Sequence, residues 1–193
     1  MITLLALFAV AALQSGTPLL DHFLNKADVN GGRLLLLLLD ADGDGRQEIF
    51  LASSTTCGNG GCVWQVYSPT SVPNQTRYLG EAGFSVAGFR FTRSAHTLRY
   101  CWHMSAAECE LGEYRFDRGT MSAHRLGFCG SASARCEAEL KQITAWQQQE
   151  RPQMLSAEVP EDGSLERLEW SQAGVPVSSA AVPNLDAALV VQK

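Results

Sequence analysis

Short apolar segments separated by polar turns run through most of the chain. Residues 34–39 are six leucines, and a second apolar segment follows at 49–52. From about residue 33 to 126 such segments recur every 8 to 14 residues. An apolar run alone does not distinguish a buried strand from a buried helix, but this regular spacing is typical of an antiparallel meander. We therefore predict a mainly β fold, propeller-like or a sandwich, with one or two short helices.

Two segments predict the helices. The first would begin with Thr17 as N-cap and Pro18 at the first helical position, and Asn30 would end it. The second would begin after Ser133 and end before Pro152. Its apolar stripe has helical spacing and consists of Cys136, Leu140, Ile143 and Trp146.

Turn residues predict two hairpins. The sequence Asp-Arg-Gly at 117–119 is typical of a tight turn between strands, and Glu-Asp-Gly at 161–163 predicts another. The tail after about residue 180 fits a strand or a helix. Aromatic residues in the predicted strands would form either a binding face or part of the core, the more usual place; examples are Trp64, Tyr67 and Tyr78.

The N-terminal run 2–13 is apolar and uncharged. It is shorter than the roughly 20 residues that a membrane span requires, and it resembles the apolar region of a secretory signal. Val10 and Ala12 form a small-residue pair suited to cleavage after Ala12, although no lysine or arginine precedes the run. The alternative is a buried N-terminal helix. We expect residues 1–12 to be a signal peptide and 13–193 to form a single β-rich calcium-binding domain.

Six cysteines occur in three pairs that are close in sequence. Six cysteines allow 15 pairings, so the sequence alone does not determine the connectivity. Because each pair flanks a turn-like segment, we predict local disulfides between Cys57 and Cys62, Cys101 and Cys109, and Cys129 and Cys136. A zinc site is the alternative, but no pair has the usual spacing of zinc ligands. Disulfides are typical of exported proteins, so we expect a periplasmic or secreted protein.

Composition and charge narrow the class of protein. The 193 residues are enough for one domain with a core, and 46% of them are hydrophobic. The formal net charge is −5, and basic residues do not cluster along the sequence, unlike those of nucleic-acid-binding surfaces. We therefore expect no nucleic-acid partner, and no stable membrane span once the signal has been removed.

The loop after the leucines carries most of the candidate chemistry. Its acidic residues stand at positions 1, 3, 5 and 9 and are Asp40, Asp42, Asp44 and Glu48. Glycines between them permit tight backbone turns, so alternate side chains can converge on one point. Calcium binds six to eight oxygen ligands in a flexible geometry, and the carbonyl of Arg46 at position 7 would supply another. We predict a Ca²⁺ site here; the alternative is a solvated acidic turn.

The loop differs from an EF-hand in two respects. Position 12 is Leu51 where that motif has a bidentate glutamate, and the flanking segments have the pattern of strands. The residues from Asp40 to Glu48 instead resemble the D-x-D-G-D-G-x-x-[DE] loop of FG-GAP, or integrin-type, calcium-binding repeats. In that family the loop joins two strands of a propeller blade, usually in several copies. The resemblance therefore implies a structural Ca²⁺ site between two strands.

No catalytic constellation stands out. The sequence contains no nucleophile elbow, and no pair of carboxylates outside the loop is recognisable as acid and base. The four histidines do not have metal-ligand spacing; they are His22, His96, His103 and His124. We therefore expect a binding protein rather than an enzyme. A secreted calcium-dependent hydrolase and a structural or adhesive envelope module remain as alternatives.

The loop, the export signal and the size also resemble those of bacterial periplasmic immunity proteins and lysozyme inhibitors. This resemblance implies that the partner is another protein, such as a secreted toxin or a lysozyme-like enzyme. A projecting loop, for which the segment 57–62 is a candidate, would then enter the active-site cleft of that enzyme. The alternative for this segment is a hairpin turn closed by a disulfide.

Overall fold

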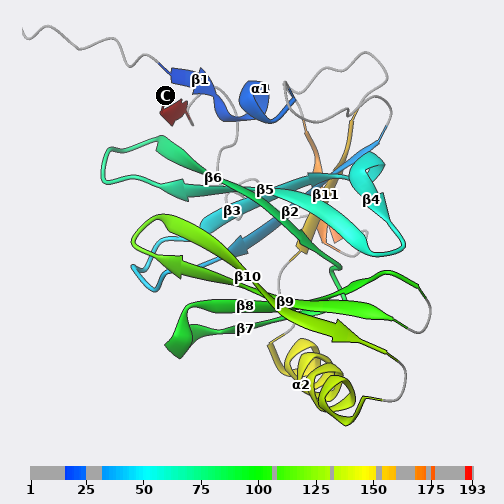
Figure 1. Ribbon diagram of the computed structural model, residues 1–193. Coiled ribbons are helices and arrows are strands. Elements are labelled where there is room, and N and C mark those ends of the chain that lie inside the picture. Colours follow the sequence, from blue (N-terminus) through cyan, green and yellow to red (C-terminus); the bar gives the residue numbers. More distant parts are fainter. Residues whose placement is uncertain are drawn as a thin grey trace, which may run out of the picture.

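The protein forms two β-sheets that pack face to face (Figure 1). The computed structural model describes residues 16–24, 32–105, 108–130, 133–150, 154–159, 168–172, 175–176 and 190–192. The predicted signal peptide at 1–12 and the predicted turn at 161–163 lie outside these residues. The fold is mainly β, as predicted, and the two facing sheets match the sandwich alternative rather than the propeller-like one.

The larger sheet has ten strands in the order β1-β14-β6-β5-β3-β2-β11-β12-β13, and β4 pairs with β5 beside this path. All its pairs are antiparallel except β14 with β6. The strands are β1 (Gly16–Pro18), β2 (Arg33–Leu39), β3 (Glu48–Ser53), β4 (Cys57–Gly58), β5 (Gly61–Pro69), β6 (Gln75–Phe84), β11 (Met154–Glu158), β12 (Trp170–Gln172), β13 (Val175–Pro176) and β14 (Val190–Gln192).

The smaller sheet is an antiparallel meander in the order β10-β9-β8-β7. Its strands are β7 (Phe89–Thr92), β8 (Thr97–His103), β9 (Cys109–Asp117) and β10 (Thr120–Cys129). Short 3-10 turns precede β4 and β8: η1 (Ser54–Thr56) and η2 (Arg93–Ala95). The predicted hairpin turn is confirmed, because Asp117 pairs with Thr120. Arg118 and Gly119 between them have φ of 45° and 71°, as a two-residue hairpin turn requires.

A helix covers the outer face of each sheet, so the molecule has four layers (Figure 1). The helix α1 (Leu19–Leu24) packs on the larger sheet through Leu19 and Phe23. The helix α2 (Ala134–Glu150) packs on the smaller sheet through Ile143. The predicted second helix is confirmed from the residue after Ser133.

The start of the first helix differs from the prediction. Thr17 and Pro18 belong to β1, which pairs with β14, and the helix begins at Leu19. The predicted N-cap position is thus occupied by a strand, because pairing with a distant segment outweighs the local capping signal. In the tail, Val190–Gln192 forms a strand.

The six-leucine run is one strand with both faces covered. Leu34 and Leu36 lie in the core beneath α1, whereas Leu37 lies in the core between the sheets. A strand at the centre of a sheet with material on both faces needs apolar residues on both sides, so its sequence does not alternate. The continuous apolar run follows from this position in the middle layer.

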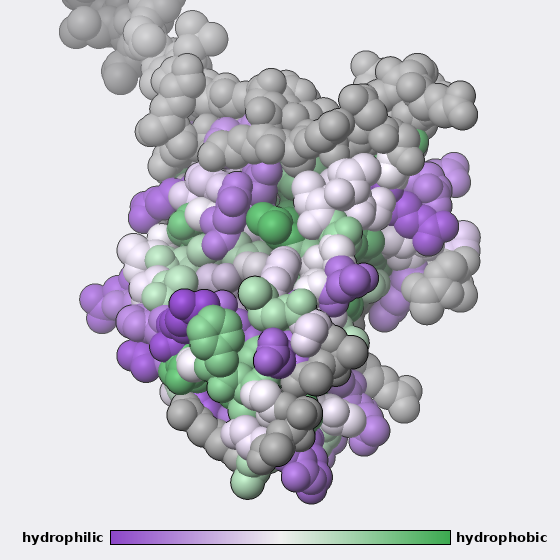
Figure 2. All heavy atoms as spheres, turned by 45° about the vertical axis from the view of Figure 1, so that its right-hand side comes forward, coloured by the Kyte–Doolittle hydropathy of each residue, from purple (hydrophilic) through white to green (hydrophobic). Residues whose placement is uncertain are grey.

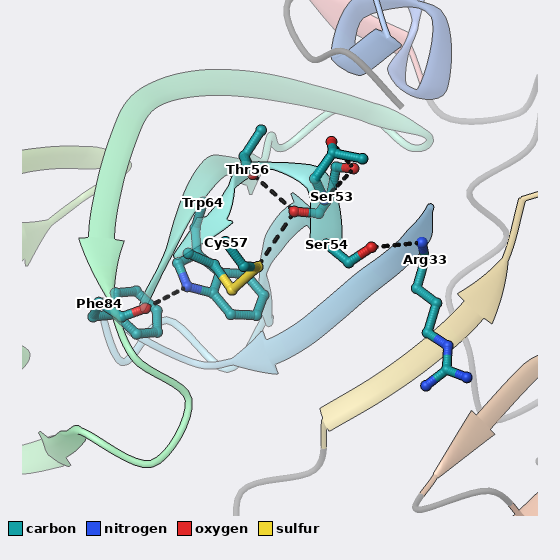
Figure 3. The surroundings of a disulfide bond; sticks show 9 residues. Arg33, Ser53, Ser54, Thr56, Cys57, Trp64 and Phe84 are labelled. Carbon is teal, nitrogen blue, oxygen red and sulfur yellow. Dashed lines mark hydrogen bonds between the residues drawn. A yellow bond between two sulfur atoms is a disulfide. The ribbon is translucent and has the colours of Figure 1, made fainter. Parts of the chain in front are cut away.

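The three disulfides are those predicted, and each closes a short local loop. The segment 57–62 is a hairpin in which Cys57 pairs with Cys62 across β4 and β5. Figure 3 shows the surroundings of this bond: Cys57 lies 3.3 Å from the carbonyl oxygen of Ser53, and the Trp64 indole donates to the carbonyl of Phe84 at 3.1 Å. The disulfides indicate a protein of an oxidising, extracytoplasmic compartment.

The aromatic residues of β5 belong to the core, since the side chains of Trp64 and Tyr67 are fully buried. Among the described residues the exposed large hydrophobic side chains come from separate parts of the chain: Val63, Val72, Met104 and Phe128. On the face seen in Figure 2, hydrophobic side chains lie in small areas between hydrophilic ones. Within the described residues, no helix is both long and apolar enough to cross a bilayer.

Candidate metal centre

The acidic loop 40–47 joins β2 and β3 and is shaped by its own aspartates. Asp42 Oδ1 accepts a hydrogen bond from the N–H of Asp44 at 3.1 Å, and Asp44 Oδ1 accepts one from the N–H of Arg46 at 2.8 Å. A bond from an aspartate to the N–H two residues further on is an Asx-turn. Two such turns in succession coil the backbone tightly.

Three of the four predicted carboxylates come together. One oxygen from each of Asp40, Asp42 and Glu48 lies within 4.8 Å of the others, a spacing at which they can share one ion. Asp40 Oδ1 is buried and accepts no hydrogen bond from any residue that the structure describes. A buried, unsatisfied carboxylate oxygen is unfavourable unless a donor or a cation compensates for the lost water. A cation next to Asp40 would provide this compensation.

Glu48 is the buried member of this group, with 1% of its surface exposed. Its Oε2 accepts a hydrogen bond from the N–H of Ala41 at 2.7 Å, and its Oε1 accepts one from the Ser68 hydroxyl at 3.0 Å. Burial, together with the charge of Asp42, raises the pKa of Glu48 to about 7. A cation in the loop would reverse this effect by favouring the ionised form.

Asp44, the fourth predicted carboxylate, is paired with Arg46. Its Oδ2 accepts from Nε of Arg46 at 2.8 Å and from a second guanidinium nitrogen, and Arg46 also donates to the carbonyl of Thr70. The hydrogen bond from the Arg46 side chain lowers the pKa of Asp44, which is therefore ionised at neutral pH. Asp44 lies outside the close group of three, so its role as a ligand stays a prediction, as does that of the Arg46 carbonyl.

The second sheet contacts the loop at two points. Asp42 Oδ2 accepts from the N–H of Gly119, in the turn between β9 and β10, at 3.0 Å. The ring of His96, which follows η2, lies over Gly43: a Cβ built on Gly43 would come 2.2 Å from His96 Cε1. Gly43 therefore permits this close approach, and its φ of 75° also favours glycine.

Sequence reasoning did not identify His96 or Gly119 as neighbours of the loop. Both belong to the second sheet, and their approach depends on how the two sheets pack. His96 Nδ1 is buried and has no hydrogen-bond partner among the described residues. No local spacing in the sequence marks this histidine, so only the fold could have revealed it.

The chemistry of this group would suit a hard cation. Three carboxylates at short distance repel one another, and oxygen donors of this kind match divalent ions such as Ca²⁺ and Mg²⁺. The arrangement could hold a divalent cation, and it does not select calcium.

Comparison with protein-family models, curated proteins and solved structures finds no match for this chain. The likeness of residues 40–48 to the FG-GAP loop thus rests on those residues alone. What the protein does has to be argued from its own geometry.

Proposed function

We propose that this chain is an exported, calcium-stabilised β-rich protein that acts by binding another protein. The observation that carries the proposal is the buried Asp40 Oδ1, which has no donor within the described part of the chain although it lies beside Asp42 and Glu48. An ion at this point would compensate all three carboxylates at once.

Calcium suits the loop better than magnesium. The group is irregular and supplies three close carboxylates, and Ca²⁺ accepts additional oxygens from flexible loops and water. The further ligands would be Asp44, after release from Arg46, and the carbonyl of Arg46. Magnesium requires a near-octahedral shell and keeps several waters, so it needs fewer protein ligands.

The ion would fix a surface rather than carry out a reaction. Asp42 would coordinate the ion, and it accepts a hydrogen bond from the N–H of Gly119 in the second sheet, so holding Asp42 would also hold the β9–β10 turn. A rigid surface loses less conformational freedom when a partner binds, and this improves affinity. Calcium would therefore support binding by preorganising the ends of both sheets.

Of the two buried carboxylates among the described residues, Glu48 belongs to the group proposed to bind the metal, and Glu113 favours a structural role over hydrolysis. Glu113 accepts from Nε of Arg115 at 2.7 Å and from Nε of Arg99 at 3.1 Å. Burial opposes its ionisation, but the hydrogen bonds from the two arginines outweigh this and lower the pKa of Glu113. A carboxylate held in this way is suited to structure and not to donating a proton.

The proposed partner is a secreted toxin or a lysozyme-like enzyme, and the proposed location is the periplasm or the exterior. In this role the chain would be an immunity protein or inhibitor, as its resemblance to such proteins implies. Export is supported by the three disulfides, which form and persist in oxidising compartments.

The metal is tested by thermal unfolding of the purified protein in excess calcium and in excess chelator. A ligand that binds only the folded state raises the melting temperature as its concentration increases. We expect a higher melting temperature with calcium, a smaller rise with magnesium, and no rise in Glu48→Gln. The exposed Glu137 on α2 provides the matched control, Glu137→Gln. No calcium response in the unaltered protein would rule out the metal.

The partner is tested by inhibition. A cell-wall-degrading enzyme that co-purifies with the chain in calcium should lose activity when the chain is added, and it should recover when chelator is added. An enzyme that binds but retains full activity would contradict the role of inhibitor.

A further inference from the structure

A pocket of about 440 Å³ lies next to the metal centre, between the β5–β6 turn and the β9–β10 turn. Arg77 of β6 and Arg118 of the β9–β10 turn line it, and Val72 supplies an exposed apolar wall. A Cβ built on Gly119 would lie 3.7 Å from Nη1 of Arg77. The Arg77 guanidinium therefore reaches across from the larger sheet to the turn of the smaller one.

Neither arginine has a carboxylate partner in the part of the chain that the structure describes. Arg46, which lines the same pocket, differs: it pairs with Asp44 and with the carbonyl of Thr70. Arg77 and Arg118 are exposed and make no such contact with the residues that the structure describes. Two guanidinium groups on one small pocket, both free to donate, form a site for an anion.

Arg118 also has an unusual backbone. Its φ is 45°, a conformation that asparagine and glycine adopt more readily than arginine. The turn itself would accept asparagine at this position without difficulty. Arg118 makes no compensating contact among the described residues, so its side chain is available to a ligand.

The acidic residues of the pocket are already engaged. Asp42 accepts from two backbone N–H groups and belongs to the metal group, and Asp44 is paired with Arg46. Their remaining negative charge would repel a phosphate dianion more strongly than a singly charged carboxylate. The apolar wall at Val72 suits the aliphatic part of a glutamate side chain.

We propose that this pocket binds a carboxylate side chain of a protein partner through Arg77 and Arg118. The proposal rests on the proposed function in one respect, namely that the chain acts by binding a protein. It also adds a coupling: Asp42 joins the metal group to the N–H of Gly119, so calcium orders the turn that carries Arg118.

The test uses a glutamate peptide, acetyl-Gly-Glu-Gly-amide, as the probe and the corresponding glutamine peptide as its neutral match. Both are titrated into the full chain in calcium while the side-chain N–H signals of the arginines are followed by NMR. We expect the glutamate peptide to shift the signals of Arg77 and Arg118 and the glutamine peptide to leave them in place. Equal shifts with both peptides, or none, would overturn the proposal. Inorganic phosphate is a third probe, and tighter binding of phosphate than of the glutamate peptide would also overturn it.

The variants Arg77→Gln and Arg118→Asn should each lower the affinity for the glutamate peptide by about tenfold, because each removes a charged hydrogen-bond donor. Both positions are exposed and asparagine accepts the positive φ, so both variants should keep the melting temperature. Arg93→Gln is the matched control, since Arg93 is an exposed arginine outside this pocket. Equal weakening in the control would contradict a specific site.

Measurements with calcium and with chelator distinguish the proposed metal centre from the proposed carboxylate pocket. With calcium bound, failure of the peptide to bind overturns the carboxylate pocket while the metal centre stands. If calcium leaves the melting temperature unchanged but the peptide binds, the metal centre fails and the pocket stands. The coupling itself predicts weaker peptide binding in chelator than in calcium, and equal affinity would overturn it.

Discussion

The side chain of Asp42 accepts a hydrogen bond of 3.0 Å from the backbone N–H of Gly119 and so attaches the acidic loop to the second sheet. The same carboxylate belongs to the group of three that can hold a cation. One residue thus links the group that could hold a cation to the turn between β9 and β10 of the second sheet.

Replacing Asp42 with alanine should destabilise the fold even without a metal. The N–H of Gly119 would lose its acceptor, and an unsatisfied hydrogen bond to a charged group costs about 1.5 to 3 kcal/mol. Urea unfolding in chelator measures the loss, and hydrogen exchange at the Gly119 amide should become faster. The control is Asp117→Ala, which removes an exposed carboxylate at the end of β9, next to the same turn. Similar losses in both variants would show that this bond contributes nothing particular.

Gly43→Ala should destabilise the protein through contact with His96. The added Cβ would come 2.2 Å from His96 Cε1, so the ring or the loop has to move. Gly45 is the matched control: its φ of 85° is similar, but nothing lies within 4 Å of its Cβ position. Gly45→Ala should therefore show only the backbone cost of about 1 kcal/mol, and Gly43→Ala a clearly larger one. Adding His96→Ala should remove most of the difference in unfolding free energy.

The stability of the metal-free protein should decrease as the pH rises from about 5 to 8. The pKa of Glu48 is about 7 in the folded state, whereas a glutamate free of these interactions has a pKa of 4.5. At pH values between the two, the folded state therefore binds more protons than the unfolded state. Stability then falls with increasing pH across this window, by about 2 kcal/mol for this residue. Urea unfolding in chelator at several pH values checks this against Glu48→Gln, which should lack the decrease. Parallel pH profiles for the two proteins would contradict it.

The attachment of α2 to the smaller sheet should depend on Glu139. This carboxylate accepts from Arg90 at 2.8 Å and from Arg99 at 3.3 Å, and 13% of its side chain is exposed. Glu139→Ala leaves two partly buried arginines without their shared partner, so we expect a loss of about 2 kcal/mol in thermal or urea unfolding. Glu137→Ala, on the same helix, removes only an exposed pair with Lys141 and should cost less than about 0.5 kcal/mol. A comparable loss in both variants would mean that the buried network is not what secures the helix.

The sequence by itself determined the features whose cause is local. The leucine run, the turn at Arg118 and Gly119 and the stripe of α2 each depend on residues a few positions apart, and each appears in the structure as predicted. The pairing of nearby cysteines is local in the same sense. Spacing also placed Asp40, Asp42 and Asp44 in a loop between two strands, although Glu48 begins the second of these strands.

The tertiary structure decided everything that requires segments distant in sequence to meet. It moved Thr17 into a strand, because pairing with β14 replaced the local capping preference. It placed His96 and Gly119 against the loop. These two contacts arise from the packing of one sheet on the other, and no short-range pattern in the chain encodes that packing.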